Sequence, residues 1–154
     1  MSRHGGFTVI QLLMVIIIIS IVAATASVRA PSTDAFQTEG FSSVLLQDLR
    51  MTSVLSMTQN QQYRIVFSAN AYSVQDQNGS ALTNYPEIAS GVITFPTGVT
   101  VTPNPTPSGN TIIFDSLGHP FDGAGAALAT TTFAVNSNGR ITNVTLNAET
   151  GYVQ

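Results

Sequence analysis

The sequence predicts an α+β protein, in which a long N-terminal helix packs on an antiparallel β-sheet head domain. Two observations carry this prediction. Residues 7–28 form an almost unbroken apolar run in which Gln11 is the one strongly polar side chain. From Tyr63 onward, short runs rich in β-branched and aromatic residues alternate with Gly, Pro, Asn and Asp, which indicates strands and turns. We therefore divide the chain into a leader (1–6), a transmembrane and assembly helix (7–28), its amphipathic continuation (29–60) and a β head domain (61–154).

The first element is a short polar leader that directly precedes the apolar run. An ordinary secretory signal is cleaved after its apolar region, whereas here the Gly5-Gly6 pair comes before it. Cleavage after Gly6 would therefore leave the apolar segment on the mature protein. That segment is long enough for the roughly 20 residues that a helix needs to cross the hydrocarbon core. Arg3 favours a cytoplasmic leader, and Arg29 after the span weakens this bias.

The next segment contains poor helix formers. Pro31 disfavours helical geometry at the residue before it, and Gly40 costs about 1 kcal/mol relative to Ala in a helix interior. We expect a kink or a soft segment between Val28 and Gly40.

Beyond Gly40 the apolar residues recur at helical spacing and predict a stripe that covers the sheet. Its members are Phe41, Val44, Leu45, Leu49, Met51 and Leu55. Leu46, Val54 and Met57 point to other sides of the same helix. They are either scattered surface hydrophobics or contacts to neighbouring helices of other molecules. Asp48 falls inside the stripe, so we expect it to bond to sheet backbone or to lie at the wet edge of the stripe.

The β head domain is predicted to contain six strands: Tyr63–Phe67, Ala71–Gln75, Val92–Phe95, Thr111–Phe114, Thr131–Val135 and Ile141–Leu146. The first two form a hairpin around residues 68–70, and Asn138-Gly139 is a strong turn signal between the last two. The proline-rich segment 102–109 is unsuited to a central strand. We expect this segment and the glycine cluster at 123–125 to be exposed loops.

The sequence of the N-terminal junction, Gly6-Phe7-Thr8-Val9-Ile10-Gln11, resembles that of the type IV pilin and pseudopilin superfamily. Three later segments resemble the H-type minor pseudopilins (GspH/FimT-like) and their MSHA-type minor pilin relatives: residues 49–60, 113–120 and 149–153. The chain departs from the family at one position, because Gln11 stands where the family has a Glu, the fifth residue of the mature protein. In the family this Glu is thought to pair with the amino terminus of a neighbouring subunit, so Gln11 is a candidate assembly residue.

This resemblance implies a minor structural subunit of an MSHA-like type IV pilus or, alternatively, a minor pseudopilin of a type II secretion system. A prepilin peptidase would cut after Gly6 and methylate the amine of Phe7. Before assembly, the subunit would lie in the inner membrane, in contact with lipid, with its head in the periplasm. It would then enter a periplasmic or cell-surface filament with other pilin or pseudopilin subunits. The chain has no phosphate-binding P-loop, so the assembly platform would use a separate ATPase.

Composition argues against other classes of function. Only 8% of the residues are charged and there is no lysine. Few side chains can therefore bind phosphate groups, and we expect no nucleic-acid partner. The chain has no cysteine and one histidine outside the leader, so we expect neither an enzyme nor a cofactor. A third class, a periplasmic binding module on an uncleaved membrane anchor, stays open.

One cluster, made of Asp115, His119 and Asp122, has oxygen and imidazole groups that suit a metal. Gly118, Pro120 and Gly123 surround these residues, and in such turns Asp and His commonly cap backbone groups. Major pseudopilins hold calcium in a loop, but these residues do not match that loop. We expect the cluster to shape a turn.

Overall fold

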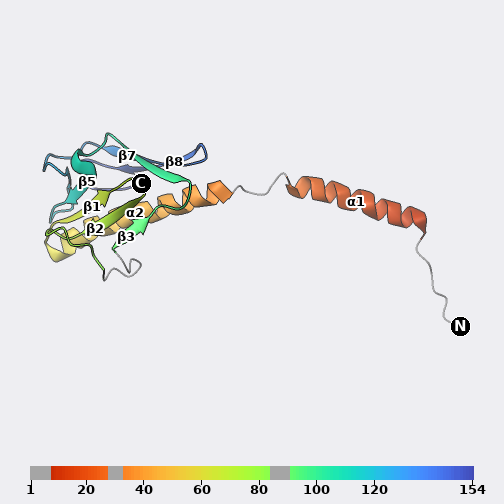
Figure 1. Cartoon of the computed structure of the whole chain (residues 1–154), viewed down its shortest axis with the longest axis horizontal. Helices are drawn as coiled ribbons and strands as arrows, with labels where there is room; N and C mark the ends of the chain where they lie inside the picture. Colours follow the sequence, from red (N-terminus) through yellow and green to blue (C-terminus); the bar gives the residue numbers. More distant parts are fainter. Residues whose placement is uncertain (1–7, 28–32, 84–90) are drawn as a thin grey trace. The chain divides into compact units, whose positions relative to one another are not determined.

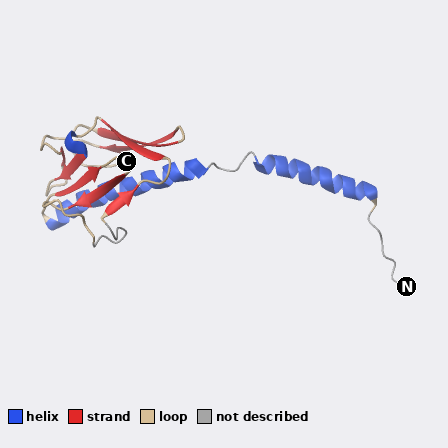
Figure 2. Ribbon diagram, in the orientation of Figure 1, coloured by secondary structure: helices blue, strands red, loops and turns tan. Residues whose placement is uncertain are grey.

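A computed structural model describes residues 8–27, 33–83 and 91–154 (Figures 1 and 2). The chain divides into two compact units, Met1–Ser32 and Thr33–Gln154. The first contains helix α1 (Val9–Ser27), and the second contains helix α2 (Thr33–Gln59) together with all the described strands. The helix α2 therefore belongs to the same unit as the sheets.

Helix α1 is 19 residues long, and its described side chains are apolar except for Gln11 and Ser20. The Ser20 hydroxyl donates to the Ile16 carbonyl at 2.7 Å, so it is satisfied within the helix. Within the described residues, the structure contains no helix with both the length and the apolarity that crossing a membrane requires. The expected span, residues 7–28, begins and ends outside the described residues and stays a prediction.

Helix α2 begins inside the segment in which we expected a kink. It starts at Thr33 and continues through Gly40, so the expected soft segment does not extend to that glycine. Residues 28–32 lie outside the described residues. Gly40 is tolerated inside the helix because tertiary packing supports the turns around it: Thr38 is fully buried and Phe41 is 6% exposed.

The buried face of α2 differs from the predicted stripe. Phe41, Leu45 and Leu49 are buried as predicted, but Val44 and Met51 are 42% and 40% exposed. Small polar residues complete the buried face instead: Thr38, Ser42, Asp48, Thr52, Ser53 and Ser56. Hydroxyls in this set donate to carbonyls of their own helix, such as Thr52 to Asp48 and Ser56 to Ser53, both at 2.7 Å. Because these groups are satisfied locally, they can be buried at little cost.

Asp48 is the charged member of this face. It is 6% exposed, and its carboxylate accepts a hydrogen bond from the hydroxyl of Tyr72. The expected position at a wet edge is therefore wrong. Burial of the Tyr72 hydroxyl raises its pKa well above the usual value, and the hydrogen bond and the negative charge of Asp48 raise it further.

The strands form two antiparallel sheets. The larger sheet has the order β3-β2-β1-β5-β6, and the smaller has the order β4-β7-β8. The strands are β1 (Tyr63–Phe67), β2 (Ala71–Gln75), β3 (Val92–Thr94), β4 (Val99–Asn104), β5 (Thr111–Phe114), β6 (Pro120–Asp122), β7 (Thr131–Ser137) and β8 (Arg140–Leu146). A single turn of 3₁₀-helix, η1 (Ser108–Asn110), precedes β5.

Six of these strands match the sequence prediction, and both predicted hairpins are confirmed. Asn138 and Gly139 adopt φ values of 49° and 85° in the turn between β7 and β8. The strands β4 and β6 were not predicted, and the expected loop at 102–109 is wrong for its first three residues. Pro103 is compatible with β4 because β4 lies at the edge of its sheet, where proline is tolerated.

The core lies where α2 meets both sheets (Figures 1 and 2). Aromatic rings connect the three parts. Phe41 of α2 packs edge-on against Phe95 at a centroid distance of 5.3 Å, and Phe67 of β1 stacks on Phe133 of β7 at 5.4 Å. One side of α2 is thus fixed against the head, and its other side is left exposed.

Candidate assembly surface

Two predicted sites lie outside the described residues. These are the leader cleavage position at Gly6 and the methylated amine at Phe7. Both stay predictions.

Gln11 is described, and it closes the first turn of α1. Its side-chain oxygen Oε1 accepts from the backbone N–H of Thr8 at 3.1 Å, and the backbone N–H of Gln11 donates to the Thr8 hydroxyl at 3.4 Å. This reciprocal pair is a capping box, in which a Thr and a Glu or Gln three residues later satisfy two backbone donors of a helix start. The atom that faces the Thr8 N–H must be the amide oxygen, since only an acceptor fits there. Within α1, Gln11 therefore fills a capping role that needs an acceptor and no charge, and its expected role in assembly stays a prediction.

The residues Asp115, His119 and Asp122 form two consecutive turns of the same design. In each turn one oxygen of the aspartate accepts from the backbone N–H groups two and four residues later. Asp115 accepts from Leu117 and His119 at 2.9 and 2.8 Å, and Asp122 accepts from Ala124 and Ala126 at 3.0 and 2.8 Å. Asp76 closes a third turn in the same way, with Asn78 and Ser80 at 2.9 and 2.8 Å.

These bonds explain what the three residues do. The Asp115 carboxylate is already committed to its own loop, and its second oxygen lies 3.5 Å from Nδ1 of His119. Among the described residues, no group of three or more His, Cys, Asp or Glu side chains is placed to hold a metal ion. The aspartates of this cluster stabilise two turns by accepting from backbone N–H groups. A glycine with positive φ closes each turn, at Gly118 and Gly125.

The three later segments that resemble the pseudopilins meet at the end of α2. Ser53 donates to the Gly118 carbonyl at 3.4 Å, and a Cβ placed on Gly151 would lie 2.3 Å from that same carbonyl oxygen. Only glycine fits at position 151, because any other side chain would displace backbone. These three segments are far apart in the sequence. Together they fix two loops, residues 113–120 and 149–153, on the helix segment 49–60.

Arg50 fixes the C-terminal segment to the same part of α2. Its Nε and Nη2 donate to the Val153 carbonyl at 3.0 and 2.6 Å, and its guanidinium lies 5.6 Å from the centre of the Tyr152 ring. The C-terminal segment in turn pairs with the end of β8 through a bridge between Leu146 and Val153. Sequence analysis did not select Arg50 as a candidate, and a lone arginine in a helix carries no signal that would identify it.

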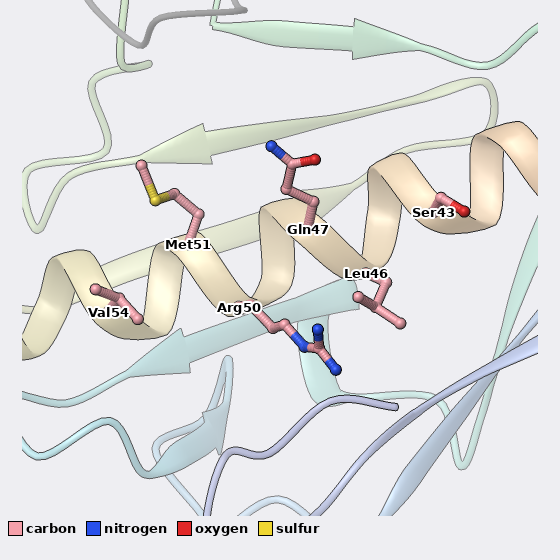
Figure 3. A pocket seen from close by; sticks show the side chains of 6 residues that line it. All are labelled: Ser43, Leu46, Gln47, Arg50, Met51 and Val54. Atoms are coloured by element: carbon pink, nitrogen blue, oxygen red, sulfur yellow. The ribbon is translucent and has the colours of Figure 1, made fainter.

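The exposed side of α2 has the form of a helix-packing surface. Two rows of side chains, spaced four residues apart, border a groove of about 350 Å³ (Figure 3). One row is Ser43, Gln47 and Met51, and the other is Leu46, Arg50 and Val54. Rows of this kind are the ridges that interdigitate when two helices pack. Val44 and Met57, which are 42% and 46% exposed, extend the apolar surface beyond the groove.

Charge is sparse among the residues that line the groove. Arg50 is the one charged residue among those lining the groove, and its guanidinium is held by the Val153 carbonyl. The two other described arginines also have structural partners, since Arg64 bonds to the Gln77 carbonyl and Arg140 pairs with Glu39 at 2.9 Å. The described outer face of α2 is therefore suited to apolar contact with another helix.

Comparisons with known proteins identify the family and the fold. A family model described as type II transport protein GspH matches residues 43–151. A search of curated proteins found no significant match. Two solved structures share the fold. The minor pseudopilin EpsH from the Type 2 Secretion System of Vibrio cholerae aligns with a TM-score of 0.59 at 13% identity, over 77% of this chain and 94% of its own. The type IV minor pilin FimU of Pseudomonas aeruginosa aligns with a TM-score of 0.56 at 16% identity, over 80% of this chain and 91% of its own.

Proposed function

Because this chain belongs to the GspH family of type II transport proteins, we propose that it is a minor pseudopilin of a type II secretion system. The family and both solved relatives are pilin-type structural subunits, so the chain acts by assembly and not by catalysis. The observation that carries the proposal is the family match, which includes the groove on α2 and most of the junction at its end.

The outer face of α2 is the assembly surface in this proposal. A helix with apolar residues on its exposed side and no covering element in its own domain is typical of an interface. The groove between the two rows fits a ridge of a neighbouring helix. Val54, which is 47% exposed, lies at one end of the groove and is the residue whose change would disturb that contact most directly.

The N-terminal segment provides the anchor. A prepilin peptidase removes residues 1–6 and methylates Phe7, and the segment 7–28 holds the subunit in the inner membrane with its head in the periplasm. The head then enters a filament through an assembly platform driven by a separate ATPase. Apolar helices pack among each other about as well as among lipid tails, so the exchange from membrane to filament has a modest free-energy cost.

A second candidate function is a minor pilin of an MSHA-like type IV pilus. The likeness to FimU favours it, because this relative aligns almost as well as EpsH does. The two functions differ in what a cell loses without the subunit. Deletion of the gene would abolish export of a secreted enzyme in the first case, and surface piliation or attachment in the second.

The experiment combines this deletion with complementation by variants of the full chain. Val54→Arg places a charge in the groove and should fail to restore the lost phenotype. Thr100→Arg, on the exposed face of the edge strand β4, is the matched control and should restore it. Intact mass of the mature chain tests processing in the same cells. A chain that retains residues 1–6 and never copurifies with other pilin-type subunits would instead support the binding module on an uncleaved anchor.

A further inference from the structure

The turn that follows β2 carries a short motif that the assembly function does not use. It reads Asp76-Gln77-Asn78-Gly79-Ser80, so an asparagine precedes a serine by two residues and the residue between them is not proline. Asn-x-Ser/Thr of this form is the sequence to which sugars are attached in secreted proteins, where it lies in surface loops. The motif therefore raises the question of whether this turn accepts a sugar.

The geometry of the turn does not require the motif. Three turns of the head share one design, in which an aspartate oxygen accepts from the backbone N–H groups two and four residues later. The residue two after the aspartate is Asn78 here, but Leu117 and Ala124 in the other two turns. Within the described residues, neither the Asn78 amide nor the Ser80 hydroxyl has a hydrogen-bond partner, so the fold leaves both groups available.

The turn presents both groups at an exposed tip. Residues 77–80 are all exposed. Gly79, with a φ of 82°, reverses the chain between Asn78 and Ser80. At the base of the tip, the Asp76 N–H donates to the Ser80 carbonyl at 2.9 Å, which closes the turn. An enzyme can therefore reach the amide and the hydroxyl together without opening a strand, as proteases do at exposed loop tips.

A second copy of the motif, Asn143-Val144-Thr145, lies inside β8 and provides an internal control. Its backbone pairs with β7, and Thr145 exchanges two further backbone bonds with Gln154, at 2.8 and 3.0 Å. Val144 is 2% exposed and belongs to the core. This copy cannot leave the sheet without breaking these bonds and exposing Val144. A third match, residues 104–106, has proline in the middle, which the acceptor motif excludes.

We propose that Asn78 is an N-glycosylation site, which receives its sugar from a lipid-linked diphosphate donor through a periplasmic oligosaccharyltransferase. The amide nitrogen of Asn78 attacks the anomeric carbon of the sugar and forms a C–N bond. The bond between that carbon and the phosphate oxygen breaks, the lipid diphosphate leaves, and one amide proton passes to a base of the enzyme. The inference rests on the proposed function, because only a periplasmic head meets this donor. A sugar is bulky and hydrophilic, so the turn after β2 faces solvent in the assembled state.

Mass spectrometry of the full chain, purified from its own cells, tests the proposal. Trypsin cleaves after Arg64 and Arg140, so the two motifs fall in different peptides, 65–140 and 141–154. We expect sugar on the first peptide at an occupancy at least tenfold higher than on the second.

Variants of the full chain assign the sugar to one atom. Asn78→Gln removes the acceptor nitrogen at that position, and Ser80→Ala removes the hydroxyl while Asn78 stays in place. Both should reduce the sugar on peptide 65–140 at least tenfold, whereas Ser80→Thr retains the motif and should retain the sugar. Thermal melts should be nearly equal for the three variants, because both positions are exposed.

The outcomes separate this proposal from the assembly function. A 65–140 peptide that is bare, or in which Asn78 is only deamidated to aspartate, overturns the glycosylation site. Sugar that persists in Asn78→Gln or Ser80→Ala also overturns it, because the sugar then lies elsewhere. A chain that starts at Phe7 and copurifies with other pilin-type subunits but carries no sugar refutes the site and leaves the assembly function standing. A chain with sugar at Asn78 that never copurifies with such subunits supports the site and refutes the assembly function.

Discussion

The hydroxyl of Tyr72 on β2 donates a hydrogen bond to the carboxylate of Asp48 on α2, and both side chains lie inside the core. The pair joins the helix to the larger sheet by a charge-assisted bond in a setting with little water. Such a bond is costly to break, because a buried carboxylate that loses its donor keeps its full desolvation penalty.

Tyr72→Phe should therefore lower the free energy of unfolding by about 1–3 kcal/mol, although it removes only one oxygen atom. Chemical denaturation of the head unit measures this loss. The matched control is Tyr63→Phe, which removes a hydroxyl that bonds to the side chain of Gln59 near the end of α2. An equal or smaller loss for Tyr72→Phe than for Tyr63→Phe would show that the buried pair contributes little.

The same pair predicts a dependence on alkaline pH. The pKa of Tyr72 is raised in the folded state, so the folded protein holds its phenolic proton at pH values where the unfolded chain releases it. The contribution is fully present below the unfolded pKa of about 10 and is lost as pH rises above it. We expect the melting temperature to fall more steeply above pH 10 in the wild-type chain than in Tyr72→Phe. Parallel curves for the two proteins would assign the alkaline loss to other groups.

The comparison of sequence and structure shows where local patterns are sufficient. The ranges of β1, β2 and β5 follow from alternation and turn residues alone, because one face of each strand is buried. The edge strand β4 was missed because Pro103 argues against a central strand and sequence alone does not tell which strands lie at an edge. The apolar part of the buried face of α2 was predicted, but its serine and threonine residues were missed because they appear polar in the sequence, whereas in a helix their hydroxyls bond to the backbone.

The candidate site shows the same division. The capping box is readable from the sequence, since Thr8 and Gln11 have the required spacing. The groove is readable only in part: Leu46 and Val54 were expected away from the stripe, but Ser43, Gln47 and Arg50 join them only once the opposite side of α2 is known to be buried. The contacts of Arg50 and Ser53 to segments about 100 and 65 residues away depend on tertiary structure.

Gly40→Ala should stabilise the head unit. Gly40 is an exposed position inside α2, and an added Cβ meets no atom within 4 Å. The glycine costs up to about 1 kcal/mol relative to alanine in such a position, so the free energy of unfolding should rise by that amount. Thermal or urea denaturation checks it. A loss of stability would mean that the start of α2 needs the backbone conformational freedom of glycine.

The aspartate turns predict a stability effect without a metal effect. Asp122→Ala removes the acceptor for two backbone N–H groups and should cost about 1–2 kcal/mol, whereas Asp122→Asn retains an acceptor and should cost less. Calcium or zinc should leave the melting temperature of the wild-type chain nearly unchanged, while a site saturated 100-fold over its Kd would add about 2.7 kcal/mol. A rise of several degrees that Asp122→Ala abolishes would show that a metal binds there.

The last prediction separates the local role of Gln11 from a role that needs charge. Gln11→Ala removes the acceptor of the Thr8 N–H and should destabilise the first turn of α1 by about 1 kcal/mol. Gln11→Glu retains the acceptor and adds a negative charge at the helix start, which is worth about 0.3–1 kcal/mol in the opposite direction. Amide hydrogen exchange of the full chain in detergent micelles measures both. The Thr8 amide should exchange about fivefold faster in Gln11→Ala and no faster in Gln11→Glu, since about 1 kcal/mol corresponds to that factor.

Complementation with the same variants gives the functional readout. If the capping box is what matters, Gln11→Glu and the wild-type chain support assembly equally well. If only Gln11→Glu raises incorporation into filaments, the position acts through charge, and the capping role is secondary.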